Sequence, residues 1–198
     1  GVFELDLDGK PNGVAVTSDV APTCKNDHGA CGVLVDGKIY TTVAQAAEVA
    51  TSGSNVTLLH NSAETVALPM GVTLNKNNFE AAGVTVAVPA AKIGETPYTT
   101  LEAAFKAAKT GDVVTVFAGT YAVPTMKAGI TIVGEGNVLF EGTLTGTLEN
   151  LTMKNIHIKG GNAQRWAYAK GKLVFENVTF EATSVYALHF DGITEGAT

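Results

Sequence analysis

The sequence predicts a mostly β fold in which short parallel strands stack as coils of a solenoid, with short Ala-rich helices at its side or end. The first observation behind this prediction is that residues 39–74 recur at residues 97–132, 58 positions later, so that Tyr40 corresponds to Tyr98. The second is a shorter repeat, in which residues 152–158 match residues 174–180 at an offset of 22. A fixed internal period is typical of repeat architectures, whose units bury their apolar faces on their neighbours.

The repeats divide the chain into three predicted segments. Residues 1–32 take no part in the longer repeat and are expected to form an irregular leader, with a short strand where apolar and acidic residues alternate over 3–8. Residues 33–90 hold the first helix-plus-strand repeat. Residues 91–198 hold the second, which runs into further coils. Because the last coil stops in mid-turn, we expect the chain to be a fragment of a longer protein.

Two cysteines in the leader favour a small covalent loop. Cys24 and Cys31 are separated by six residues, so we expect a local disulfide, which would fit an oxidising compartment. The alternative is a metal site that also uses Asp27 and His28. It lacks the paired ligand spacing of a structural zinc site.

A second group in the leader offers oxygen ligands. Asp6, Asp8 and Asn12 weakly resemble a calcium-binding loop, but the bidentate Glu and the Gly of such loops are missing. A plain turn is the favoured interpretation, and no cofactor is predicted.

Each repeat is predicted to open with a helix. Thr42 with Gln45, and Thr99 with Glu102, have capping-box spacing. Apolar residues recur at helical spacing in both copies, at Val43, Ala46, Ala47 and Ala50 and at Leu101, Ala104, Phe105 and Ala108. Glycines at the same offset, Gly53 and Gly111, are expected to end the helices in left-handed caps.

The shorter repeat predicts the register of the coils. At an offset of 22, Met153 falls on Phe175 and Ile156 on Val178, which would form inward stacks. In the same register Asn155 falls on Asn177, and such amides can hydrogen-bond along the stack. Lys154 likewise falls on Glu176, which predicts an exposed ion pair between coils worth at most ~1 kcal/mol.

Residues 98–121, with their Tyr-Thr-Thr-Leu-Glu-Ala-Ala-Phe helix and Gly-Asp turn, resemble the opening of the pectin-lyase-like right-handed parallel β-helix superfamily. Residues 171–180 resemble an ordinary coil of that superfamily. The doubled unit is also similar to modules of large surface proteins of Gram-positive gut bacteria. The resemblance implies a right-handed parallel β-helix. It leaves the function open, because the superfamily includes lyases, hydrolases, esterases, phage tailspikes and adhesins.

The residues that catalysis would need in such a fold are missing. A lyase would need clustered carboxylates near a basic residue. The only arginine is Arg165, and no pair of Asp or Glu residues falls at the matching position one coil below it. A hydrolase would need paired Asp residues, whereas Asp191 is the only Asp after Asp112. We therefore predict no catalytic residues. The alternative is a polysaccharide-active enzyme whose catalytic coils lie outside this chain.

Charge and hydropathy exclude two classes of partner. The formal net charge is −6 at pH 7, from 13 Lys and Arg against 19 Asp and Glu, without a basic stripe. Nucleic-acid backbones bind to clustered basic residues, so nucleic acid is excluded. No apolar run approaches the ~20 residues of a transmembrane helix.

Residues 160–171 interrupt the period of the coils and are predicted to project as a loop. This segment contains the only Trp and the only Arg of the chain. Its candidate ligand-binding residues are Asn162, Gln164, Arg165, Trp166 and Tyr168. Aromatic rings stack on sugars, and amide or guanidinium groups hydrogen-bond to hydroxyls or carboxylates. The alternative is that Trp166 and Tyr168 fill one face of a buried strand.

His189 and Asp191 lie two apart on one strand face and complete the candidate site, although a solvated pair is the simpler interpretation. Together these patterns favour a non-catalytic module of a secreted or cell-surface bacterial protein. Its expected partner is a polysaccharide or host glycan, to which the module would bind or adhere outside the cell. A structural spacer or phage-fibre segment is the other alternative.

Overall fold

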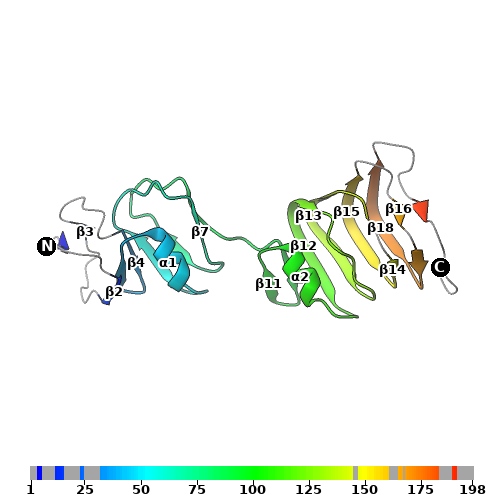
Figure 1. The fold of residues 1–198 in the computed structure, drawn as a ribbon, viewed down its shortest axis with the longest axis horizontal. Helices are drawn as coiled ribbons and strands as arrows, with labels where there is room; N and C mark the ends of the chain where they lie inside the picture. Colours follow the sequence, from blue (N-terminus) through cyan, green and yellow to red (C-terminus); the bar gives the residue numbers. More distant parts are fainter. Residues whose placement is uncertain are drawn as a thin grey trace. The chain divides into compact units, whose positions relative to one another are not determined.

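The structure is a computed structural model that describes residues 4–5, 12–15, 23–24, 32–144, 147–160, 165–166, 168–182 and 189–190. It is mostly β, with 49% strand and 10% helix, and its strands stack as a β-solenoid of about six turns (Figure 1). The chain divides into two compact units, Gly1–Val88 and Pro89–Thr198. The predicted fold class, a β-solenoid with two short helices in the described part, is confirmed.

The first unit is built around one sheet with the strand order β2-β5-β4-β6-β8, and two strand pairs, β1-β3 and β7-β9, complete it. Its elements are β1 (Glu4–Leu5), β2 (Asn12–Ala15), β3 (Thr23–Cys24), β4 (Val33–Val35), β5 (Lys38–Tyr40), α1 (Val43–Val49), β6 (Asn55–Leu58), β7 (Val66–Leu68), β8 (Thr73–Asn75) and β9 (Val84–Val86).

The second unit is built around a sheet with the order β11-β10-β12-β13-β15-β18, in which β12, β13, β15 and β18 run side by side as long strands (Figure 1). Two short pairs, β14-β17 and β16-β19, complete it. Its elements are β10 (Ala91–Ile93), β11 (Thr96–Tyr98), α2 (Leu101–Ala107), β12 (Val113–Ala122), β13 (Thr131–Glu141), β14 (Thr147–Glu149), β15 (Thr152–Gly160), β16 (Arg165–Trp166), β17 (Tyr168–Lys170), β18 (Val174–Ala182) and β19 (His189–Phe190).

The two copies of the repeat share more structure than the sequence predicts. Each opens with an antiparallel hairpin, β4-β5 or β10-β11, before the helix. The strand after the helix then pairs antiparallel with the first hairpin strand, as β6 with β4 and β12 with β10. A parallel strand follows in both copies. The repeat therefore begins with a hairpin, which the sequence analysis did not predict.

The helices begin at threonine caps, but only the first has a capping box. Thr42 Oγ1 accepts from the amide of Gln45 at 3.1 Å, and Gln45 Oε1 accepts from the amide of Thr42 at 3.3 Å, as predicted. The cap of α2 is Thr100, whose Oγ1 accepts from the amide of Ala103 at 3.2 Å. The predicted box from Thr99 is wrong, because the third helical residue is an alanine that cannot reach back.

The glycines after the helices have a different role from the predicted one. Both helices end in an extended alanine, Ala50 or Ala108, rather than in a left-handed cap. Gly53 and Gly111 lie three residues further on, each with φ of 93°. Their amides donate to the carbonyls of Gly71 and Gly129, at 2.9 and 2.7 Å. These glycines therefore bend the chain and join one coil to the next.

The predicted register of the later coils is confirmed. Ile132, Met153 and Phe175 stand opposite one another on β13, β15 and β18, and Met153 is fully buried. At the bend, Asn155 and Asn177 have positive φ, and their side chains share a 3.0 Å hydrogen bond. Outside, Lys154 Nζ lies 2.6 Å from a Glu176 carboxylate oxygen. Buried apolar side chains thus form the core between exposed polar ladders.

Candidate functional site

Three of the binding residues predicted from the sequence lie on neighbouring short strands of the second unit. β16 pairs in parallel with β19, with Arg165 opposite His189 and Trp166 opposite Phe190. Parallel pairing of successive coils therefore brings together residues that are far apart in the sequence. The backbone positions of Arg165 and Trp166 therefore lie next to a second aromatic position, Phe190.

The segment 160–171 is not one projecting loop. Tyr168 begins β17, which pairs in parallel with β14 so that Tyr168 stands opposite Thr147. The loop prediction is wrong for the residues of β16 and β17, because their backbones hydrogen-bond to neighbouring coils as strands do. The other predicted site residues of this region, Asn162, Gln164 and Asp191, lie outside the described residues.

The predictions for the leader remain predictions. Asn12 is the first residue of β2, and Cys24 is the last residue of β3. Their expected partners Asp6, Asp8 and Cys31 lie outside the described residues. Within the described ranges, no group of three or more His, Cys, Asp or Glu side chains is placed to hold a metal ion.

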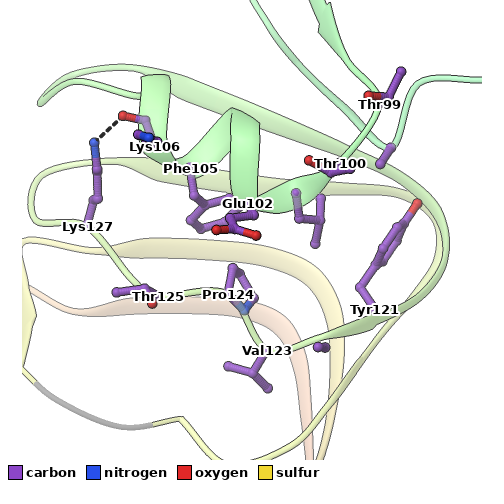
Figure 2. A pocket seen from close by; sticks show the side chains of 13 residues that line it. Thr99, Thr100, Glu102, Phe105, Lys106, Tyr121, Val123, Pro124, Thr125 and Lys127 are labelled. Carbon is purple, nitrogen blue, oxygen red and sulfur yellow. Dashed lines mark hydrogen bonds between the residues drawn. The ribbon is translucent and has the colours of Figure 1, made fainter.

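A groove of about 670 Å³ lies between α2 and residues 121–127 in the second unit (Figure 2). Five side chains give it an apolar lining: Leu101, Phe105, Tyr121, Val123 and Pro124. Leu101 and Phe105 are buried in the core beneath the helix, whereas Tyr121, Val123 and Pro124 are half-buried. The groove therefore has a fixed floor and one wall made by the chain that leaves β12.

Hydrogen bonds fasten this wall to its surroundings. Lys127 Nζ donates to the carbonyls of Lys106 and Ala108, at 2.7 and 3.0 Å (Figure 2). These carbonyls end the helix and have no partner within it, and a cation is favourable there. The amide of Val123 donates to the carbonyl of Glu141 on the next coil, at 3.1 Å. Both sides of the groove are therefore held in place.

Tyr121 presents its ring to the groove. Its hydroxyl donates to the carbonyl oxygen of Phe117 at 3.0 Å. Burial raises the pKa of the Tyr121 hydroxyl, so the phenol stays protonated and keeps this bond at physiological pH. The main chain thus engages the polar end of the side chain, which fixes the orientation of the ring.

One acidic side chain, one basic side chain and two hydroxyl groups lie around the apolar lining. Glu102, Lys106, Thr99 and Thr125 all line the groove and are exposed. Figure 2 shows the Glu102 carboxylate reaching over the groove between Phe105 and Pro124. The described residues include no hydrogen bond or ion pair of the Glu102 or Lys106 side chain. The two side chains therefore form no ion pair with each other, although they lie four positions apart on α2, and both are exposed.

The sequence analysis missed this groove, although the repeat contains a signal for it. In the first copy the Glu64 carboxylate accepts from the amides of Val43 and Ala44, at 2.9 and 3.0 Å, and so covers the start of α1. The residue 58 positions later is Ala122, which lines the groove beside α2. The loss of one carboxylate between the copies marks the place where the second copy is open.

A second depression, of about 510 Å³, lies where the long strands bend. Four of its side chains stand in register on successive coils: Thr120, Leu139, His157 and Thr179. His157 Nε2 and Lys159 Nζ lie 3.0 and 2.9 Å from the two carboxylate oxygens of Glu181. The hydrogen bond from Lys159 lowers the pKa of Glu181. This carboxylate is therefore an ionised member of a surface network.

The comparisons with known proteins add no relative. No protein-family model matches the chain, and no curated protein or solved structure is significantly similar to it. Among the described residues, neither helix has the length and apolar character needed to cross a membrane.

Proposed function

We propose that this chain is a non-catalytic recognition module of a secreted or cell-surface bacterial protein, which binds or adheres to a glycan on a rigid β-solenoid. The pectin-lyase-like right-handed parallel β-helix is the family that we propose for it. One observation carries the proposal: β16 and β19 are paired, so that Arg165 stands opposite His189 and Trp166 opposite Phe190. The chain thus gathers its only Arg and only Trp with a second aromatic residue on adjacent coils.

These residue types fit the recognition of sugars. Aromatic faces pack on the apolar face of a sugar ring, and a guanidinium group donates hydrogen bonds to hydroxyls or carboxylates. Stacked strands lie about 4.8 Å apart, so the paired backbone positions of β16 and β19 have a spacing close to the length of one sugar ring. Rigid presentation also lowers the entropy cost of binding.

Three carboxylates of the second unit form ion pairs between coils, which supports a non-catalytic role for them. Glu149, Glu176 and Glu181 lie 2.8, 2.6 and 2.9 Å from Lys170, Lys154 and Lys159. Each carboxylate is therefore engaged by a lysine on a neighbouring coil. A glycosidase requires two carboxyl groups that face one bond from opposite sides, and these ion pairs do not have that arrangement.

A glycan array tests the proposal. The parent chain and its Trp166→Ala variant would be compared, with circular dichroism to show that both are folded. Val88→Ala is the control, because Val88 is a solvent-exposed apolar residue at 77% exposure in the first unit. We expect selective binding by the parent and the control, and its loss in Trp166→Ala. A folded parent that binds no glycan would overturn the proposal in favour of a spacer, or of an activity in coils outside this chain.

A further inference from the structure

We propose that the groove beside α2 is a second carbohydrate site, which takes a short segment of a neutral glycan. It lies on different elements from β16 and β19, and it rests on the proposed function only for the general class of ligand. Its volume of about 670 Å³ is within the range of about 300–1,000 Å³ that is common for ligand sites. The groove can therefore hold more than one sugar ring.

The apolar part of the groove suits the carbon face of a sugar. Tyr121 provides a ring whose hydroxyl is already bonded to the carbonyl of Phe117, so ligand binding need not break that bond. Pro124 and Phe105 line the same groove, across it from the Tyr121 ring (Figure 2). An aromatic ring beside small apolar surfaces gives a sugar a flat contact without rearrangement.

The polar part favours a neutral ligand over a charged one. The Glu102 carboxylate accepts hydrogen bonds, and the Lys106 ammonium donates them. Both line the groove on one helix, four positions apart. The third charged residue of the lining, Lys127, has its ammonium bonded to the carbonyls of Lys106 and Ala108. A ligand with a net charge would therefore be attracted by one of the two remaining charges and repelled by the other. Sugar hydroxyls can donate to Glu102 and accept from Lys106. Charge-assisted bonds of this kind are stronger than those between neutral groups.

The first copy of the repeat has a carboxylate at the position that corresponds to Ala122. There Glu64 fills the corresponding place and bonds to the amides of Val43 and Ala44. Ala122 has no side chain that could do the same beside α2. Introducing a glutamate at this position should therefore close the groove and leave the fold intact, which provides a test variant that does not depend on removing a core residue.

The experiment is an NMR titration of the whole chain with four neutral trisaccharides: maltotriose, cellotriose, xylotriose and mannotriose. We expect at least one to shift the resonances of Tyr121 and Thr125, with a dissociation constant on the order of 1 mM. Trigalacturonate, which is anionic, is the charged comparison and should bind more weakly. Because the shifts are assigned to residues, they test this groove whether or not the array detects binding at Trp166.

Two variants and one control complete the test. Ala122→Glu and Glu102→Gln should each weaken the binding by roughly tenfold or more, equivalent to the loss of one good contact. Glu95→Gln, at an exposed position on the turn between β10 and β11, is the matched control and should bind as the parent does. The proposal is overturned if no neutral trisaccharide shifts the groove resonances, if Ala122→Glu folds and binds like the parent, or if only trigalacturonate binds.

Discussion

The two copies of the repeat differ in what covers their helices. In the first unit the Glu64 carboxylate covers the start of α1, through bonds to the amides of Val43 and Ala44. In the second unit Ala122 occupies that place, and a groove runs beside α2. The comparison places a carboxylate bound to the start of the helix in one copy and a groove beside the helix in the other, although both copies keep the hairpin and the helix.

The second strands of the two hairpins, β5 and β11, also differ in whether a further strand pairs with them. In the first unit β2 pairs with β5, so that Val14 stands opposite Ile39. The residue that corresponds to Ile39 in β11 is Pro97, and in the described residues β11 is the end strand of its sheet. Proline has no amide to donate and is suited to the edge of a sheet. The second copy thus blocks strand addition at the place where the first copy accepts a strand.

The largest expected difference between the units is in core packing. Ile132 and Leu74 correspond in the repeat, but Ile132 is fully buried beneath β15, whereas Leu74 lies half-buried on the end strand β8. Ile132→Ala should lower the free energy of unfolding of the second unit by about 2–5 kcal/mol. Leu74→Ala should cost the first unit less than about 2 kcal/mol. Hydrogen exchange resolved by peptide measures each unit separately, and equal losses would contradict this account.

The carboxylate that covers α1 should be worth less than a core residue but should be measurable. Glu64→Ala leaves the amides of Val43 and Ala44 without their partner and removes a favourable charge from the start of the helix. We expect a loss of about 1–2 kcal/mol in the first unit. Glu64→Gln keeps one acceptor oxygen and should lower the stability of the first unit by less. The same exchange experiment tests both variants, and protection of α1 unchanged in Glu64→Ala would disprove the role of the carboxylate.

Asparagines in the left-handed conformation allow a finer comparison. Asn155 and Asn77 have φ of 56° and 49°, a conformation that glycine adopts readily. Only Asn155 also bonds to the next coil, through Asn177. Asn155→Gly should therefore cost about 0.5–1.5 kcal/mol for the lost bond, and Asn77→Gly should be nearly neutral. Urea denaturation would check this, and similar losses in both variants would mean that the ladder adds no stability.

The smallest expected effects concern the dependence of stability on pH and salt. The pKa of Glu181 is lowered by the hydrogen bond from Lys159, and that of Asp36 by the hydrogen bond from the backbone amide of Asn55. A lowered pKa means that the stabilisation is present at neutral pH and is lost as the pH falls through the folded-state pKa. Glu181→Gln and Asp36→Asn should each flatten this acid-side loss.

Salt distinguishes the two carboxylates. Ions screen the attraction between Lys159 and Glu181 but have little effect on a bond to a neutral amide. Denaturation midpoints measured from neutral pH down to about pH 3, at low and high salt, should therefore show a salt-sensitive contribution from Glu181 alone. A salt-sensitive contribution from Asp36 would contradict this assignment.

Much of the fold could be predicted because stacking leaves a direct trace in the sequence. Met153 and Phe175, or Asn155 and Asn177, occupy the same place on successive coils, and the structure confirms that they are opposite one another. The hairpin before each helix escaped prediction because its strands are only three residues long, too short to show a period. The cap of α2 was placed one residue early, at Thr99, although alignment with Thr42 points to Thr100.

The candidate sites were less accessible to sequence reasoning. Arg165 and His189 were both selected for their chemistry, but their proximity depends on how many residues each coil contains, which no local pattern reveals. The groove beside α2 is lined by residues from two segments that meet only in the folded chain. Its one visible signal was the change from Glu64 to Ala122 between the copies, a difference within a repeat rather than a motif.

The most direct test of this account is a crystal structure of the chain soaked with the neutral trisaccharide that binds best, because both copies of the repeat are then observed in one molecule. The account predicts sugar density against Tyr121 in the groove beside α2, and none beside α1, where Glu64 occupies the corresponding place. Density beside both helices, or beside neither, would contradict the claim that the second copy has been opened for recognition.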